Sequence, residues 1–120
     1  MHYCLMYGSL RRYSKRGYNF NRFAQYGEQI YIRDVKLNGY EMYDLGAYPA
    51  VCVGTGIIKC ELHAVTNEVF NYIEAMELRV GYFPKTIKLN IDFNDEEVII
   101  FLYPKRLLNG VKKVVGGDWN

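Results

Sequence analysis

Strand-length apolar segments separated by short turns fill most of this sequence, and one segment has the periodicity of a helix. The helix is expected over residues 68–77, with Thr66 or Asn67 as its N-cap. A 16% share of aromatic residues, which includes 12 tyrosines, also favours β-structure. The expected strands are residues 2–7, 28–37, 40–46, 50–54, 56–65, 83–91 and 96–104. The pattern therefore predicts an α+β fold in which a mixed sheet forms a small β-barrel with one main helix.

The length and composition place the chain among ordinary globular proteins. With 120 residues and neither a repeat nor a linker, residues 1–120 are expected to form a single domain around one core. No apolar run approaches the roughly 20 residues of a transmembrane helix, and the first residues lack the layout of a signal peptide. We therefore expect no membrane partner and a cytoplasmic location, while the sequence leaves the oligomeric state open.

The cysteines predict neither a metal site nor a disulfide framework. Cys4, Cys52 and Cys60 are an odd number without a C-x-x-C pair, and only two histidines accompany them. Small buried thiols in a reducing compartment are the better interpretation.

Two further expectations concern which side chains face the core. In the second expected strand, the alternation of apolar and polar residues points Ile30 and Ile32 inward, with Val35 or Leu37 continuing that face. The glycine-punctuated C-terminal tail, residues 109–120, is expected to lie on the surface.

The stretch MYGSLRR is the first with a chemical implication. A strand that stops at Tyr7, Gly8 and Ser9 leaves consecutive backbone N–H groups free, and glycine lets a ligand approach the chain closely. Such a turn can hold a carboxylate or an oxyanion, although a Gly-Ser pair after a strand is also common in ordinary turns.

Neither a serine nor a cysteine nucleophile is favoured. No G-x-S-x-G elbow surrounds Ser9, and no acid is spaced to complete a triad with His63. Cys60 and His63 lie three residues apart on an expected strand, so their side chains point to opposite faces.

A basic and aromatic stretch follows the turn, and such stretches are typical of phosphate or RNA contact. The alternative is a solvated loop, which we favour because the net charge is only +2 and no RNP-like or KH-like motif is present. The residues concerned are Arg11, Arg12, Lys15 and Arg16, interleaved with Tyr13 and Tyr18. Nucleic acid is therefore not an expected partner.

One acid interrupts the apolar face of the expected helix. Glu77 lies seven residues after Phe70 and four after Ile73, so at about 100° per residue it points the same way. One interpretation is that Glu77 ends the helix and reaches solvent beside Arg79. The other is a functional carboxyl group, because burial and the negative end of the helix dipole both raise its pKa toward neutrality. Near neutrality, one group can accept a proton and return it.

Five motifs follow one another along nearly the whole chain: YGSLRR, GYEMYDLGAYPAV, IIKCELHAV, YIEAMELRVGYFPKT and GGDW. As an ordered set they resemble the gamma-glutamylcyclotransferase-like family, which includes small bacterial members and gamma-glutamylamine cyclotransferases. The resemblance implies a small α+β fold with a mixed β-barrel. It also implies an enzyme that uses neither metal nor cofactor and that releases 5-oxoproline and a free amine from a small gamma-glutamyl amide.

The resemblance assigns roles to residues within these motifs. Glu77 would act as general base toward the attacking alpha-amine and then as general acid toward the leaving nitrogen. The loop that starts at Tyr7 would hold the glutamyl carboxylate or the amide oxygen through its backbone N–H groups. The expected substrate-binding residues are Tyr7, Gly8, Ser9, Leu10 and Tyr82.

The chain departs from the usual motifs of that family at positions that concern the substrate more than the fold. These are Cys60 for glycine, His63 for tyrosine, Glu74 for aspartate, Leu78 for glycine, and Pro84 within FPK, where a basic residue usually comes sooner. The amine half of the substrate therefore stays open. So does a second function class, a binding module that captures a small metabolite or signalling molecule on the same fold without turnover.

Overall fold

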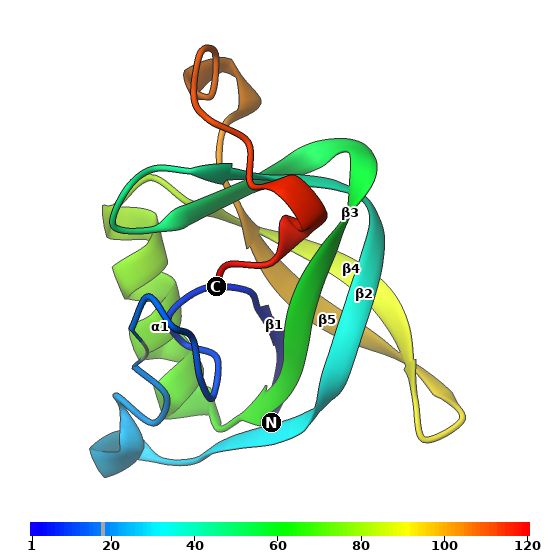
Figure 1. Ribbon diagram of the computed structural model, residues 1–120. Coiled ribbons are helices and arrows are strands. Elements are labelled where there is room, and N and C mark those ends of the chain that lie inside the picture. The colour runs from blue at the N-terminus through cyan, green and yellow to red at the C-terminus, as the bar shows by residue number, and fades with distance from the viewer. Residues whose placement is uncertain (18) are drawn as a thin grey trace.

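A curled five-stranded sheet forms the framework of the molecule, which a computed structural model describes over residues 1–17 and 19–120 (Figure 1). The strands are β1 (His2–Met6), β2 (Gln29–Asp44), β3 (Pro49–Val65), β4 (Phe83–Ile91) and β5 (Asn94–Leu102). The helices are α1 (Asn67–Arg79) and the short 3-10 turns η1 (Ala24–Tyr26), η2 (Lys105–Leu107) and η3 (Val115–Gly117). The sheet order is β2-β3-β1-β5-β4, and β1 runs antiparallel to β3 but parallel to β5. The predicted α+β class with a mixed sheet is confirmed.

The sheet is not the closed barrel that the sequence predicted. β2 and β4 are its two edges, and no backbone ladder joins them in the described part of the chain. Instead the sheet curls until Leu37 of β2 and Leu89 of β4 pack against the same buried cluster. The Arg33 guanidinium also donates a hydrogen bond to the Asn90 carbonyl at 3.1 Å. A ladder needs backbones about 4.8 Å apart, whereas these two strands meet through their side chains.

A β-bulge near the start of β2 overturns the predicted direction of its side chains. The register shifts between Tyr31 and Arg33, so Ile32 is the extra residue and the alternation restarts beyond it. Ile30 and Ile32 are 45% and 36% exposed, so the inward placement predicted for them is wrong. Val35 and Leu37 pack against the core instead.

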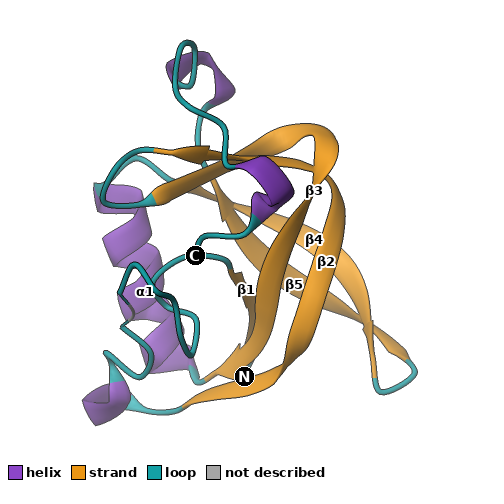
Figure 2. Ribbon diagram, in the orientation of Figure 1, coloured by secondary structure: helices purple, strands orange, loops and turns teal. Residues whose placement is uncertain are grey.

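β1 lies at the centre of the sheet and is covered on both faces, because its side chains alternate between two cores. Leu5 belongs to the core inside the curl, whereas Cys4 faces α1, which buries Phe70 and Ile73 against it. Figure 2 shows α1 on one side of the molecule and the strands on the other. The helix begins directly after its N-cap Thr66, as predicted, and ends two residues beyond the predicted end.

The C-terminal tail does not stay on the surface as predicted. Trp119 is only 2% exposed, and Asp118 forms an ion pair with Arg11 at 2.9 Å. The Arg11 guanidinium also donates a hydrogen bond to the Trp119 carbonyl. Gly117 lies against the Ile57 carbonyl so closely that a Cβ atom would clash there. The tail is therefore locked onto both β3 and the loop after β1.

The cysteines are free thiols buried in the protein, as predicted. Burial raises the pKa of both Cys4 and Cys60 to about 12, which keeps these thiols protonated and unreactive. Among residues 1–17 and 19–120, no cluster of three or more His, Cys, Asp or Glu side chains is placed to hold a metal ion. Within the same residues, no helix has the length and apolar character needed to cross a membrane.

Candidate active site

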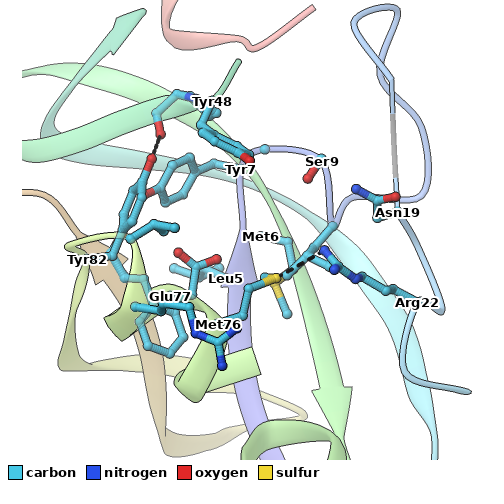
Figure 3. A pocket seen from close by; sticks show the side chains of 16 residues that line it. Leu5, Met6, Tyr7, Ser9, Asn19, Arg22, Tyr48, Met76, Glu77 and Tyr82 are labelled. Atoms are coloured by element: carbon cyan, nitrogen blue, oxygen red, sulfur yellow. Dashed lines mark hydrogen bonds between the residues drawn. The ribbon is translucent and has the colours of Figure 1, made fainter. Parts of the chain in front are cut away.

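The six residues that the sequence singled out line one cavity of about 270 Å³ (Figure 3). The loop after β1 forms one wall, the last turn of α1 forms another, and the segment between α1 and β4 contributes a tyrosine. These residues are Tyr7, Gly8, Ser9, Leu10, Glu77 and Tyr82. A concave site of this size suits a small metabolite rather than a macromolecule.

Glu77 supplies the one carboxyl group among the described residues that line the cavity. Its side chain is half-buried and points into the cavity in Figure 3, so the interpretation in which it reaches open solvent is wrong. No hydrogen bond or ion pair reaches this carboxylate from the described part of the chain. Burial raises the pKa of Glu77 from 4.5 to about 7. The group is therefore able to hold or release a proton near neutral pH.

The end of α1 explains why Tyr82 returns to the same cavity. The Glu77 carbonyl accepts hydrogen bonds from the backbone N–H groups of Val80 at 3.3 Å and Tyr82 at 3.0 Å. Gly81 between them has φ of 98°, a conformation that favours glycine and reverses the chain after the helix. The acid and the tyrosine are thus held together by one helix terminus.

Two of the tyrosines that line the cavity already donate hydrogen bonds through their O–H groups. Tyr7 donates to the Phe101 carbonyl at 2.5 Å, and Tyr82 donates to the Pro49 carbonyl at 2.6 Å. Burial, above all other causes, raises the pKa of both phenols well above the usual value, so they stay neutral. The phenols therefore shape the wall, and Glu77 is the group that can exchange a proton near neutral pH.

The loop from Gly8 to Leu10 directs its carbonyls into the protein and leaves its N–H groups free. The Gly8 carbonyl accepts from the Arg11 N–H at 3.2 Å, and the Ser9 carbonyl accepts from the backbone of Asn19. No intrachain acceptor for the N–H groups of Gly8, Ser9 and Leu10 is found in the described residues. Three consecutive free donors beside a cavity fit the predicted role of holding an anionic oxygen.

A buried hydrogen-bond network clamps this loop from two sides. The Gln29 side-chain amide donates to the Leu10 carbonyl at 3.1 Å and lies 2.9 Å from Nδ1 of His63. Nε2 of His63 lies 3.0 Å from Glu61, which also accepts the Arg12 backbone N–H at 2.8 Å. Burial lowers the pKa of His63, and the donor at Nδ1 assigns the proton to Nε2. Sequence reasoning noted His63 as a departure but missed this supporting role.

Neither nucleophile considered from the sequence is paired with His63 in the described part of the chain. His63 is occupied by Gln29 and Glu61 rather than by Ser9 or Cys60. Cys60 belongs to the core inside the curl of the sheet, on the opposite side of β3 from His63.

The basic loop is largely neutralised within the protein. Arg11, Arg12 and Arg16 each form an ion pair, with Asp118, Glu61 and Asp44 respectively. Arg16 also stacks on the Trp119 ring, with 3.7 Å from its guanidinium carbon to the ring centroid. Tyr18, the second tyrosine of the predicted stretch, lies outside the described residues. That nucleic acid is not a partner stays a prediction.

Several lining residues were missed by the sequence reasoning. Asn19 and Arg22 come from the irregular segment before η1, Tyr48 comes from the turn before β3, and Met76 and Arg79 come from α1. Only the basic and aromatic character of the segment before η1 hinted at Arg22, because an irregular loop has no periodicity from which a direction can be read.

The fold and the cavity define a class of protein: a small mixed-sheet domain in which, among the described residues, one carboxyl group with a pKa of about 7 and three free backbone N–H groups line the same cavity. A family model described as gamma-glutamyl cyclotransferase, AIG2-like, matches residues 4–120. The chain belongs to this family, which supports an enzyme of the cyclotransferase type.

Relatives and solved structures agree with this placement. The chain is 25% identical over 114 residues to the gamma-glutamylcyclotransferase family protein YtfP of Escherichia coli K12, covering 95% of this chain and 92% of that protein. The fold matches PH0828 from Pyrococcus horikoshii with a TM-score of 0.71 and 20% identity, over 99% of this chain and 90% of that one. It matches the solution structure of Escherichia coli ytfP with a TM-score of 0.67 and 23% identity, over 98% and 95% of the two chains.

Proposed function

We propose that the protein is an intramolecular cyclotransferase that converts a small gamma-glutamyl amide into 5-oxoproline and a free amine, with Glu77 as both general base and general acid. The observation that carries this proposal is the one carboxyl group among the described residues that line the cavity, whose pKa of about 7 suits both halves of a proton relay. Family membership supports the reaction class.

The reaction needs only a proton carrier and a site for negative charge. The alpha-amino nitrogen of the substrate attacks its own gamma-carbonyl carbon, a ring N–C bond forms, and the carbonyl electron pair moves onto oxygen. Glu77 takes the proton from the attacking nitrogen. The free N–H groups of Gly8, Ser9 and Leu10 stabilise the oxyanion.

Collapse of this intermediate completes the reaction. The oxygen electron pair re-forms the carbonyl, the C–N bond to the amine half breaks, and Glu77 returns its proton to the leaving nitrogen. Water is neither consumed nor released. Because attack is intramolecular, holding the substrate in its folded-back conformation supplies much of the rate.

The test is the formation of 5-oxoproline from a panel of gamma-glutamyl compounds, followed by mass spectrometry. We expect turnover by the wild type. Its rate should fall as the pH drops below about 7, because Glu77 is then protonated and cannot accept a proton. Glu77→Gln keeps the shape of the side chain but not its proton exchange, so single-turnover rates should fall by at least about a hundredfold while ligand affinity is largely kept.

Glu74→Gln is the matched control, because Glu74 lies on the same helix but outside the cavity lining. Its turnover should equal that of the wild type. If the wild type binds a gamma-glutamyl compound and makes no 5-oxoproline from any member of the panel, the protein is a capture module and the proposal fails. The expected independence from metal is tested by dialysis against a chelator, after which turnover should be unchanged.

A further inference from the structure

His63 is a buried titratable group that the proposed reaction leaves unused. Its ring is completely buried, and Nδ1 lies 2.9 Å from the amide nitrogen of Gln29. The same amide nitrogen donates to the Leu10 carbonyl at 3.1 Å. Only a neutral ring with its proton on Nε2 can accept at Nδ1, because a protonated ring donates at both nitrogens. The charge of His63 is therefore coupled to the hydrogen bond that holds Leu10.

Gln29 has a second arrangement available, in which it no longer holds the loop. Its amide nitrogen faces two acceptors, whereas its amide oxygen is buried and has no hydrogen-bond partner among the described residues. When His63 gains a proton, the N–H groups of the ring and of the amide face each other as two donors. A half-turn of the amide places the unpartnered oxygen against Nδ1–H and relieves this contact. The same rotation removes the donor from the Leu10 carbonyl and sets an oxygen against it.

The surroundings of His63 place this change on the acid side of pH 6.5. Burial is the main cause that lowers the pKa of His63, the charge of Arg12 lowers it further, and Glu61 acts in the opposite direction. The Tyr31 phenol and the Cys4 thiol both have raised pKa values and stay neutral. The titratable or charged groups that face the ring are Glu61 of β3, Tyr31 of β2, Cys4 of β1 and Arg12 of the loop after β1.

We propose that Gln29 and His63 are positioning residues that hold the loop of backbone donors in its anion-binding conformation, and that protonation of His63 releases this loop. The effect on turnover rests on the proposed function, in which the N–H groups of Gly8, Ser9 and Leu10 stabilise the oxyanion. Because the oxyanion forms only during the reaction, release of the loop lowers kcat more than it raises KM.

NMR spectra of the three loop N–H groups, recorded from pH 8 to pH 5, test the structural part without turnover. They are recorded in Glu77→Gln, so that ionisation of Glu77 does not move the signals. We expect the loop signals to shift together with the His63 ring, with one midpoint below pH 6.5. When Gln29→Met is added, the ring should still titrate but the loop signals should no longer follow it. His2→Asn, which removes the other histidine of the chain, should leave the coupling unchanged.

Kinetics test the catalytic part. Gln29→Met should lower kcat at pH 7.5 by about tenfold or more and change KM by less than about threefold. Gln25→Met, at an exposed glutamine of η1, is the matched control and should behave as the wild type. Below the midpoint of His63, log kcat of the wild type should fall with a slope that approaches two, because His63 and Glu77 each take up an inactivating proton. His63→Asn keeps an acceptor for Gln29 but does not titrate, so its slope should be one.

The proposal fails if the loop signals do not follow the His63 ring, or if they follow it equally in Gln29→Met. A slope of one in the wild type would also overturn it, as would acid unfolding, followed by Trp119 fluorescence, before the ring titrates. Absence of 5-oxoproline would defeat the proposed function instead. The NMR coupling in Glu77→Gln then decides the positioning role, because it needs neither turnover nor a variant of the buried network.

Discussion

Glu77→Gln should stabilise the fold at neutral and alkaline pH and leave it unchanged in acid. Glutamine has the shape of glutamate but does not ionise. Because the pKa of Glu77 is raised from 4.5 to about 7 in the folded state, the folded protein binds this proton more tightly than the unfolded chain does. The contribution of Glu77 to the free energy of unfolding of the wild type therefore falls as the pH rises from 4.5 to about 7. Below pH 4.5 the carboxyl group is protonated in both states, and its ionisation no longer destabilises the fold.

The size of the effect follows from the same pKa. Each unit of pKa corresponds to about 1.36 kcal/mol, so a rise from 4.5 to about 7 makes the ionised carboxylate cost the folded state about 3 kcal/mol at most. The cavity opens to water, which screens part of that cost. We expect Glu77→Gln to raise the free energy of unfolding by about 1 to 3 kcal/mol at pH 8, and by close to zero at pH 4.

Urea unfolding at pH 4, 6 and 8 measures this difference. Trp119 is the single tryptophan and is only 2% exposed, so its fluorescence reports the loss of tertiary structure. Glu74→Gln is the control, and its effect on stability should not change with pH in the same way. A Glu77→Gln effect that is constant from pH 4 to 8, or destabilising at pH 8, would show that the carboxyl is not buried at an energetic cost.

Three further predictions concern the loop and its supports. Ser9→Ala should change kcat/KM of the cyclotransferase reaction by less than about threefold, because the backbone donors are kept; total loss would indicate a nucleophilic serine. Gly8→Val should abolish turnover, because a Cβ atom at this position would lie 3.0 Å from Pro49. Tyr82→Phe leaves the Pro49 carbonyl without its donor and should lower the free energy of unfolding by about 1 to 2 kcal/mol in urea titrations; an unchanged midpoint would contradict the hydrogen bond. Because burial lowers the pKa of His63 below 6.5, NMR spectra at pH 6.5 should show a neutral ring with its proton on Nε2, and the contribution of His63 to the free energy of unfolding should be lost as the pH falls below that value. Titration of the ring at or above pH 6.5 would refute the buried network.

Much of the architecture could be predicted because it depends on local rules. The helical period alone fixed the direction of Glu77 relative to Phe70 and Ile73, and the structure places that face inward. The strands β4 and β5 were predicted from two apolar runs, and the structure pairs them antiparallel. The end of β1 at a glycine likewise located the loop of backbone donors. Each of these inferences uses residues that are close in sequence.

What only the tertiary structure decided depends on residues far apart in the chain. The bulge in β2 follows from its register against β3, and the burial of Trp119 follows from contacts with Arg11 across 108 positions. Arg22 reaches the cavity from an irregular segment whose path is set by its neighbours in space. The openness of the sheet was also decided by distant segments, because β2 and β4 pack side chains on the same buried cluster without pairing their backbones in the described residues. Periodicity describes a side chain relative to its own helix or strand, whereas these features require knowing which distant segment packs against it.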